Sequence, residues 1–199
     1  DERGRIAPLE PMMPKLPWGV APVLVGAAQV ASWAGAPLNP RRVRATLTPR
    51  GMEDLLLSDE IRDVEIPAMN GHFDAVSLAS MYSMLANMGE FHGVRILSRE
   101  TVQKLSEIQN DQRDRVVVVN MQWRLGYHRV PKANSVLPFV YGHLGFGGSG
   151  AWADPQNNLA MAMVCNRGGG TPIGDRRILQ LTMAAANSAR RPARVAFST

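Results

Sequence analysis

The sequence predicts a mixed α/β fold of the α+β sandwich type, in which helices flank an antiparallel sheet. Two observations lead to this prediction. Residues 139–166 alternate short apolar runs with Gly- and Asn-rich turns, which is typical of an antiparallel meander of three strands. Apolar residues recur at helical spacing before this region, over 73–88, and after it, over 174–190. A meander with a packed C-terminal helix forms the edge of such a sandwich.

The composition is that of a folded domain. The chain has 199 residues, of which 45% are apolar, and this is enough to bury a substantial core. The net charge is +5, but the basic residues are spread along the chain and no nucleic-acid-binding motif accompanies them. The denser group of Arg190, Arg191 and Arg194 indicates a solvated tail. We therefore expect no nucleic-acid partner.

No pattern settles the structure of residues 1–65, which we expect to belong to the same domain as 66–199. Several prolines near the N-terminus indicate irregular backbone. Residues 16–40 lack charge and are long enough to span a bilayer, but Gly, Ala, Pro, Gln and Ser dilute their hydropathy. A hydrophobic lining or a buried helix is the favoured interpretation. A short helix is expected over 52–62, ending before Pro67.

Two helices are expected next. The first covers 73–88, where a methionine-rich face indicates ordinary core packing, and Gly89 ends it in a left-handed conformation. The second covers 98–109. Ser98 is its predicted N-cap, and Glu100 lies in the first turn, where the helix dipole favours a negative charge.

The strands are expected to begin ahead of the meander, so that the strand-rich region covers 116–166. Residues 116–119 are β-branched, and 123–130 could form another strand. The only cysteine, Cys165, lies in the last apolar run, so no intrachain disulfide can form and a small buried thiol is expected there.

Two segments of the chain resemble the serine β-lactamase/penicillin-binding-protein superfamily, in particular its class C-like esterase branch. The first, over 66–102, contains the stretches IPAMNGH, LASMY, LANMG and GVRILS. The second, over 142–155, reads GHLGFGGSGAWADP and leads into the apolar run 159–166. The resemblance covers about 66–190 and implies a β-lactamase/transpeptidase-like fold, of which this chain is the C-terminal part.

The second segment resembles the stretch that holds the family's third motif, written Lys-Thr-Gly in many members and His-x-Gly in others. Here it is His143-Leu144-Gly145. The resemblance implies that this strand lines the cleft, that Leu144, Gly145 and Gly147 lie against substrate, and that the Phe146 backbone N–H is an oxyanion-hole donor. His143 would orient the substrate or the catalytic tyrosine. Because a histidine need not be charged at pH 7, it attracts a substrate carboxylate less strongly than lysine does. The histidine therefore favours ester hydrolysis over β-lactamase or carboxypeptidase activity.

The family's nucleophile is absent from this chain. It lies in Ser-x-x-Lys, where one helical turn lets the lysine take the serine's proton. No serine here has lysine three residues later, and Tyr82, Tyr127 and Tyr141 do not begin a Tyr-x-Asn motif. In the family both motifs precede the part that this chain covers. We therefore expect an N-terminal part of the same protein to carry them, and the complete enzyme to cleave a small-molecule ester or amide through an acyl-enzyme. The isolated chain should associate with that part or with itself.

Other interpretations of the glycine-rich segment and of the histidines are less favoured. Residues 147–150, Gly-Gly-Ser-Gly, lack the second glycine of a nucleophile elbow, because Ala151 stands there, and a hairpin turn is favoured. The same glycines lack the lysine and helix of a phosphate loop. The histidines lack the spacing of a metal site, so no metal or cofactor is expected. His143 could also be a plain strand histidine. The alternative function is a non-catalytic β-lactamase-like scaffold or assembly subunit.

Overall fold

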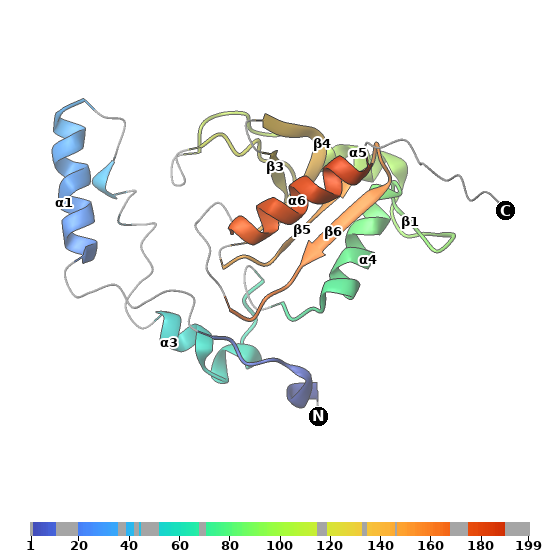
Figure 1. Ribbon diagram of the computed structural model, residues 1–199, viewed down its shortest axis with the longest axis horizontal. Helices are drawn as coiled ribbons and strands as arrows, with labels where there is room; N and C mark the ends of the chain where they lie inside the picture. Colours follow the sequence, from blue (N-terminus) through green and yellow to red (C-terminus); the bar gives the residue numbers. More distant parts are fainter. Residues whose placement is uncertain are drawn as a thin grey trace. The chain divides into compact units, whose positions relative to one another are not determined.

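The computed structural model describes residues 2–10, 20–35, 39–41, 44, 52–67, 71–114, 119–132, 135–145, 147–167 and 175–189 (Figure 1). The chain divides into two compact units, which are described separately. The first comprises Asp1–His72, Arg113–Asn120 and Asn166–Gly168, and the second comprises Phe73–Gln112, Met121–Cys165 and Gly169–Thr199.

The first unit contains short helices. They are η1 (Glu2–Arg5), α1 (Val20–Trp33), α3 (Met52–Leu57) and η2 (Glu60–Asp63). Helix α1 forms from the uncharged apolar segment, but Val23, Val30 and Trp33 are exposed, so it is not the buried helix that was one expectation. No helix within the described ranges is long and apolar enough to cross a membrane. The helix expected over 52–62 is interrupted after Leu57, and the chain continues as the 3₁₀ turn η2.

The second unit is built on a four-stranded antiparallel sheet with the order β3-β4-β5-β6. Its strands are β3 (His128–Lys132), β4 (Ser135–Leu144), β5 (Gly150–Asp154) and β6 (Leu159–Met163). The meander of three strands predicted over 139–166 is confirmed. Each strand runs back beside the one before it, because turns of only a few residues join β4 to β5 and β5 to β6.

The first described strand of the sheet, β3, begins later than the strand expected over 123–130. Residues 115–118, which include most of the expected strand 116–119, lie outside the described residues. The strand expected over 123–130 starts only at His128, and Trp123 makes an isolated bridge to Asn110. Positive φ angles at Gln122 (47°) and Gly126 (82°) explain the difference, because they break the extended backbone that a strand requires.

Two helices precede the sheet. Helix α4 (Ala75–Ala86) begins at Asp74, whose carboxylate accepts the Ser77 N–H at 2.7 Å. Gly89 follows with φ of 90°, as predicted, and a side chain there would collide with the Leu97 carbonyl.

Helix α5 (Arg99–Ser106) begins at its predicted N-cap, Ser98, which accepts the Thr101 N–H at 3.0 Å. It ends three residues before 109, since Glu107 is already extended. A hairpin that no sequence pattern predicted, β1 (Glu90–Phe91) and β2 (Val94–Arg95), joins the two helices.

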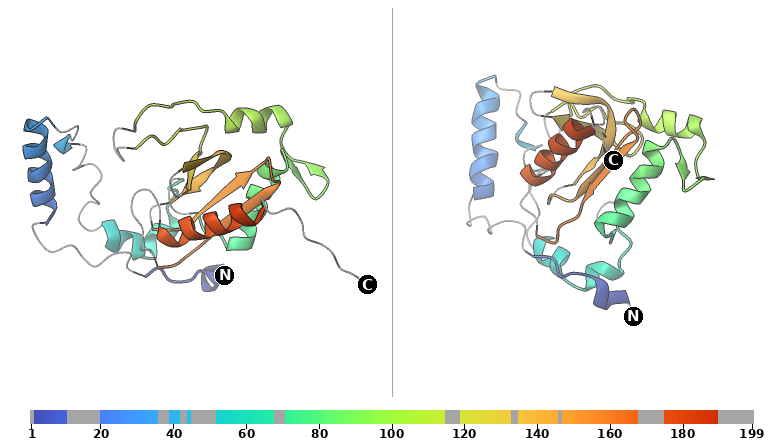
Figure 2. Two further views of the ribbon diagram at one scale, coloured as in Figure 1. Left: turned by 45° about the horizontal axis from the view of Figure 1, so that its top comes forward. Right: turned by 45° about the vertical axis from the view of Figure 1, so that its right-hand side comes forward.

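The sheet separates two apolar cores. On one face, Ala151 and Ala153 of β5 pack with α4, and on the other, Trp152 packs with α6 (Arg176–Ala189). Figure 2 shows the two helices on opposite faces of the strands. The core on the α4 face consists of Tyr82, Leu85, Ala86, Val102, Tyr141, Ala151 and Ala153. The core on the α6 face consists of Val130, Leu137, Val140, Leu144, Trp152, Ile178 and Ala186.

We expect the buried bond from the Trp152 Nε1–H to the Thr182 hydroxyl, 2.9 Å long, to stabilise the α6 face. Thr182→Val keeps the shape but leaves the indole N–H without an acceptor. This should lower the free energy of unfolding by about 1–3 kcal/mol in urea denaturation. Thr182→Ser, which keeps the hydroxyl, should lower the free energy of unfolding by less than Thr182→Val does. Equal stability of the wild type and Thr182→Val would contradict this assignment.

Candidate active site

The residues of the predicted motif lie where β4 ends. His143 and Leu144 are the last two residues of the strand, and Gly145 follows it. The His143 side chain is exposed, whereas that of Leu144 is buried in the α6-side core, so Leu144 can meet a substrate only through its backbone. Phe146 lies outside the described residues. Gly147 is buried in the turn to β5, with φ of 103°.

The two-residue period of β4 sets the direction of these side chains. Tyr141 and His143 share the face covered by α4, and Leu144 points to α6. Strand β4 approaches β5 closely at Gly142, where a side chain would strike the backbone of Ala151 and Trp152. The glycine at this position therefore allows the motif strand to lie against β5.

A second histidine lies beside the motif. His128, in β3, is 3% exposed and its ring centroid is 5.1 Å from that of His143. Its Nε2 atom accepts the backbone N–H of Leu144 at 3.0 Å. Its other nitrogen, Nδ1, lies 2.8 Å from the carbonyl of Arg129. Since Nε2 accepts, the neutral ring carries its proton on Nδ1 and donates it to that carbonyl.

Both rings are neutral at pH 7. Burial lowers the pKa of His128 to about 4, helped by the nearby charges of Arg124 and Arg129 and opposed by the bond to the Arg129 backbone. The residue His143 is exposed as a whole, but its ring is partly desolvated where it packs on His128, and this holds the pKa of His143 below its ordinary value. A neutral His143 can donate or accept a hydrogen bond, but it supplies no fixed positive charge.

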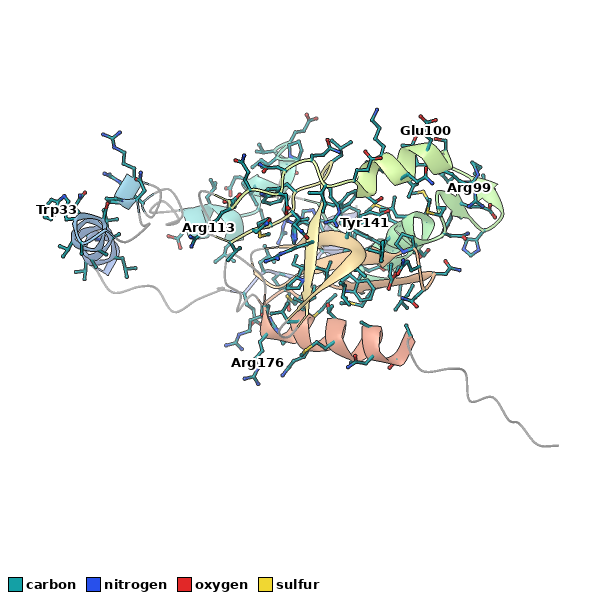
Figure 3. The ribbon with its side chains drawn as sticks, turned by 90° about the horizontal axis from the view of Figure 1, so that it is seen from above. Trp33, Arg99, Glu100, Arg113, Tyr141 and Arg176 are labelled. Carbon is teal, nitrogen blue, oxygen red and sulfur yellow. The ribbon has the colours of Figure 1, made fainter. Side chains whose placement is uncertain are left out.

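Three tyrosines lie under the same face of the sheet. The ring of Tyr127 meets those of Tyr82 and Tyr141 edge-on, at centroid distances of 6.0 and 5.4 Å. Burial raises the pKa of all three phenols above their ordinary value, so they stay protonated at neutral pH. Figure 3 shows Tyr141 in the interior of the unit, and its buried hydroxyl has no hydrogen-bond partner among the residues that the structure describes. None of these phenols is prepared to act as a general base.

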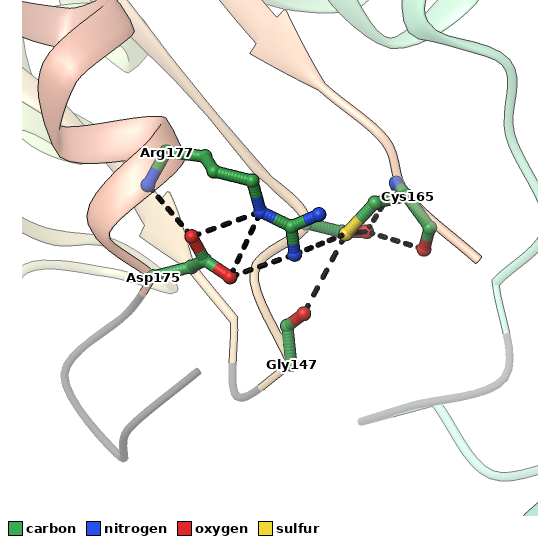
Figure 4. Close-up of polar contacts among 5 residues, drawn as sticks. Gly147, Cys165, Asp175 and Arg177 are labelled. Atoms are coloured by element: carbon green, nitrogen blue, oxygen red, sulfur yellow. Dashed lines mark hydrogen bonds and ion pairs between the residues drawn. The ribbon is translucent and has the colours of Figure 1, made fainter. Parts of the chain in front are cut away.

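The turn after the motif is fixed by polar contacts at its far side (Figure 4). The Ser149 hydroxyl accepts the Cys165 N–H at 3.1 Å and donates to the Cys165 carbonyl at 3.3 Å. The Cys165 thiol donates to the Gly147 carbonyl at 3.5 Å, and Arg177 lies between the thiol (3.8 Å) and Asp175 (2.7 Å). Ser149 is thus engaged in holding the turn to the end of the sheet.

The strand that ends at Leu144 was predicted from the sequence, whereas the contacts of His128, Asp175 and Arg177 were not. His128 bonds a backbone N–H sixteen positions away, and a backbone partner leaves no trace in a sequence pattern. Asp175 lies inside the helix predicted over 174–190, whereas the observed α6 begins at Arg176; an acidic residue at a helix start is a signal that could have placed this boundary. Among the described residues, no group of three His, Cys, Asp or Glu side chains could hold a metal ion.

Known proteins resemble both the sequence and the fold. Over 106 residues the chain is 46% identical to the Esterase/beta-lactamase LipL of Mycobacterium tuberculosis, which covers 53% of this chain and 24% of that protein. The crystal structure of a family VIII carboxylesterase superposes with a TM-score of 0.63 and 28% identity, covering 72% of this chain and 38% of the other. The crystal structure of a penicillin-binding protein homolog from Caulobacter crescentus superposes with a TM-score of 0.64 and 31% identity, covering 76% of this chain and 41% of the other.

These proteins are all much longer than this chain, which spans about a quarter of LipL and about two fifths of the solved structures. The sequence profile of the Beta-lactamase family matches residues 19–185. That range holds both helices before the sheet, all four of its strands and most of α6. The chain therefore belongs to the Beta-lactamase family.

Proposed function

We propose that this chain is the C-terminal part of a serine hydrolase that cleaves small-molecule esters or amides through an acyl-enzyme. The observation that carries the proposal is the exposed, neutral His143 at the open end of β4, in a chain of this family. The names of its relatives, an esterase/beta-lactamase and a carboxylesterase, support the same reaction class.

In this proposal the end of β4 is the wall against which the substrate lies. The backbone of Leu144, Gly145 and Gly147 faces the acyl group, and the Phe146 N–H donates to the oxyanion of the tetrahedral intermediate. His143 hydrogen-bonds the substrate or the catalytic tyrosine. Because its ring is neutral, it offers less attraction to a substrate carboxylate than a lysine would, and this favours neutral esters.

The nucleophile and its base belong to a part of the protein outside residues 1–199. Among the described residues, the Ser149 hydroxyl is hydrogen-bonded to the backbone of Cys165 and to no lysine or histidine. The buried tyrosines hold their protons. The N-terminal part, carrying Ser-x-x-Lys and Tyr-x-Asn, is therefore the proposed partner, and the chain's coverage of less than half of its solved relatives agrees with it.

Covalent labelling tests where the nucleophile lies. We expect a fluorophosphonate probe to modify the complete protein stoichiometrically and to leave the isolated chain unmodified, as read by intact-protein mass spectrometry. Ser149→Ala in the complete protein should still be labelled. Labelling of the isolated chain at Ser149 would instead revive the nucleophile-elbow interpretation, and an unlabelled complete protein would favour the scaffold.

Replacing His143 tests the cleft assignment. In the complete protein, His143→Ala should reduce ester turnover by roughly 10- to 100-fold, since a misplaced substrate costs rates of this order. Its melting temperature should stay near that of the wild type, because the side chain is exposed. His143→Gln, which keeps a polar group, should recover part of the activity. Unchanged turnover in His143→Ala would place the site elsewhere.

The partner proposal predicts the solution behaviour of the isolated chain. Strand β6, of sequence LAMAM, ends the sheet, and its outer edge pairs with no strand among the described residues. Open edges promote pairing with other chains. We expect the isolated chain to self-associate in sedimentation experiments and the complete protein not to do so through this edge. A monodisperse monomer of residues 1–199 with a sharp melt would count against this expectation.

A further inference from the structure

We infer that His128 is a positioning residue for the ester-hydrolysis site, because its ring holds the free end of the motif strand in place. This inference rests on the proposed function. It starts from a mismatch in strand length. The last residue pair between β3 and β4 is His128 with Gly142, and β4 continues for two more residues to Leu144. The Leu144 N–H therefore lies past the backbone of β3.

The His128 ring takes the place of the missing strand partner. Its Nε2 atom accepts the Leu144 N–H at 3.0 Å, which extends the bonding of β4 to the residue before Gly145. The His143 ring packs edge-on against the same imidazole, with an interplanar angle of 65°. One buried side chain thus contacts both a backbone group and a side chain of the motif.

The ring has little freedom to move. Its Nδ1–H donates to the Arg129 carbonyl at 2.8 Å, and the Trp123 ring packs edge-on at a centroid distance of 5.6 Å. Both nitrogens are bonded to backbone, so the tautomer and the orientation are fixed together. Because the ring is itself held in place, it can fix the position of the Leu144 N–H. A functional site at the end of a strand requires such support.

Only the neutral ring can do this. A proton on Nε2 would point at the Leu144 N–H, so two donors would face each other. The neighbouring groups Arg124, Arg129 and His143 also disfavour a positive charge, and the pKa of about 4 agrees with the geometry. The neutral form and its bond to Leu144 therefore persist through the neutral and mildly acidic range.

Two substitutions in the complete protein separate positioning from packing. His128→Leu removes the acceptor and leaves the Leu144 N–H buried without a partner. In His128→Gln the side-chain carbonyl can still accept that N–H. With a neutral p-nitrophenyl ester, we expect kcat to fall roughly 10- to 100-fold in His128→Leu with a smaller change in KM, and His128→Gln to recover most of it. Equal kcat in the wild type and a folded His128→Leu would overturn the inference.

Hydrogen exchange gives a readout that does not depend on activity. The Leu144 amide should be protected in the wild type and in His128→Gln, and should exchange faster in His128→Leu. If the wild type hydrolyses no ester, the proposed function fails, while the amide still reports on His128. If His128→Leu does not fold, the test rests on His128→Gln, which should keep both most of the wild-type kcat and the protection of the Leu144 amide. Loss of both, or an unprotected Leu144 amide in the wild type, would overturn the inference.

The pH dependence of stability supplies a third measurement. The folded-state pKa of His128 lies below its ordinary value of 6.5, so the unfolded chain takes up the proton first as the pH falls. The contribution of neutral His128 to the free energy of unfolding is therefore complete above pH 6.5 and is lost as the pH falls toward 4. We expect the wild type to lose more stability than His128→Gln across this window. Parallel profiles would show that the ring is not held neutral and would contradict the inference.

Discussion

The close packing of β5 between two helices is the constraint on which the second unit depends. Ala151 and Ala153 are small enough for α4 to approach one face, and Trp152 fills the other face under α6. Strand β4 must then run beside β5 with a glycine at Gly142, because any side chain there would strike the neighbouring backbone. This register exposes His143 and buries Leu144. The position of the motif is thus a consequence of core packing.

The end of β4 is held from both sides. On one side His128 bonds the Leu144 N–H. On the other side the turn after Gly145 is closed by its own backbone and tied to Cys165 through Ser149. Strand termini usually fray, and a reacting group placed on one would move too freely to orient a substrate. The polar contacts around this terminus give it the rigidity that the proposed chemistry requires.

Most of the second unit follows from sequence patterns, because local rules determine its elements. Ser98 caps its helix, and apolar alternation from residue 139 onward predicts strands with only short turns between them. The strand expected over 123–130 starts only at His128, since Gln122 and Gly126 adopt left-handed backbone conformations that interrupt an extended strand. The contact of His128 was not predicted, because its partner is a backbone N–H that only folding brings close. A backbone N–H is common to nearly all residues, so no sequence pattern marks this partner.

We propose that the end of β4 forms one wall of an active site whose nucleophile lies outside this chain. A crystal structure of the complete protein, trapped as an acyl-enzyme with a slowly hydrolysed ester, would locate both the nucleophile and this wall. We expect the acyl group to be bound to a serine of Ser-x-x-Lys, with its carbonyl oxygen within hydrogen-bonding distance of the Phe146 N–H and His143 beside it. An acyl group attached to a serine within residues 1–199, or lying away from β4, would show that the proposed site is wrong.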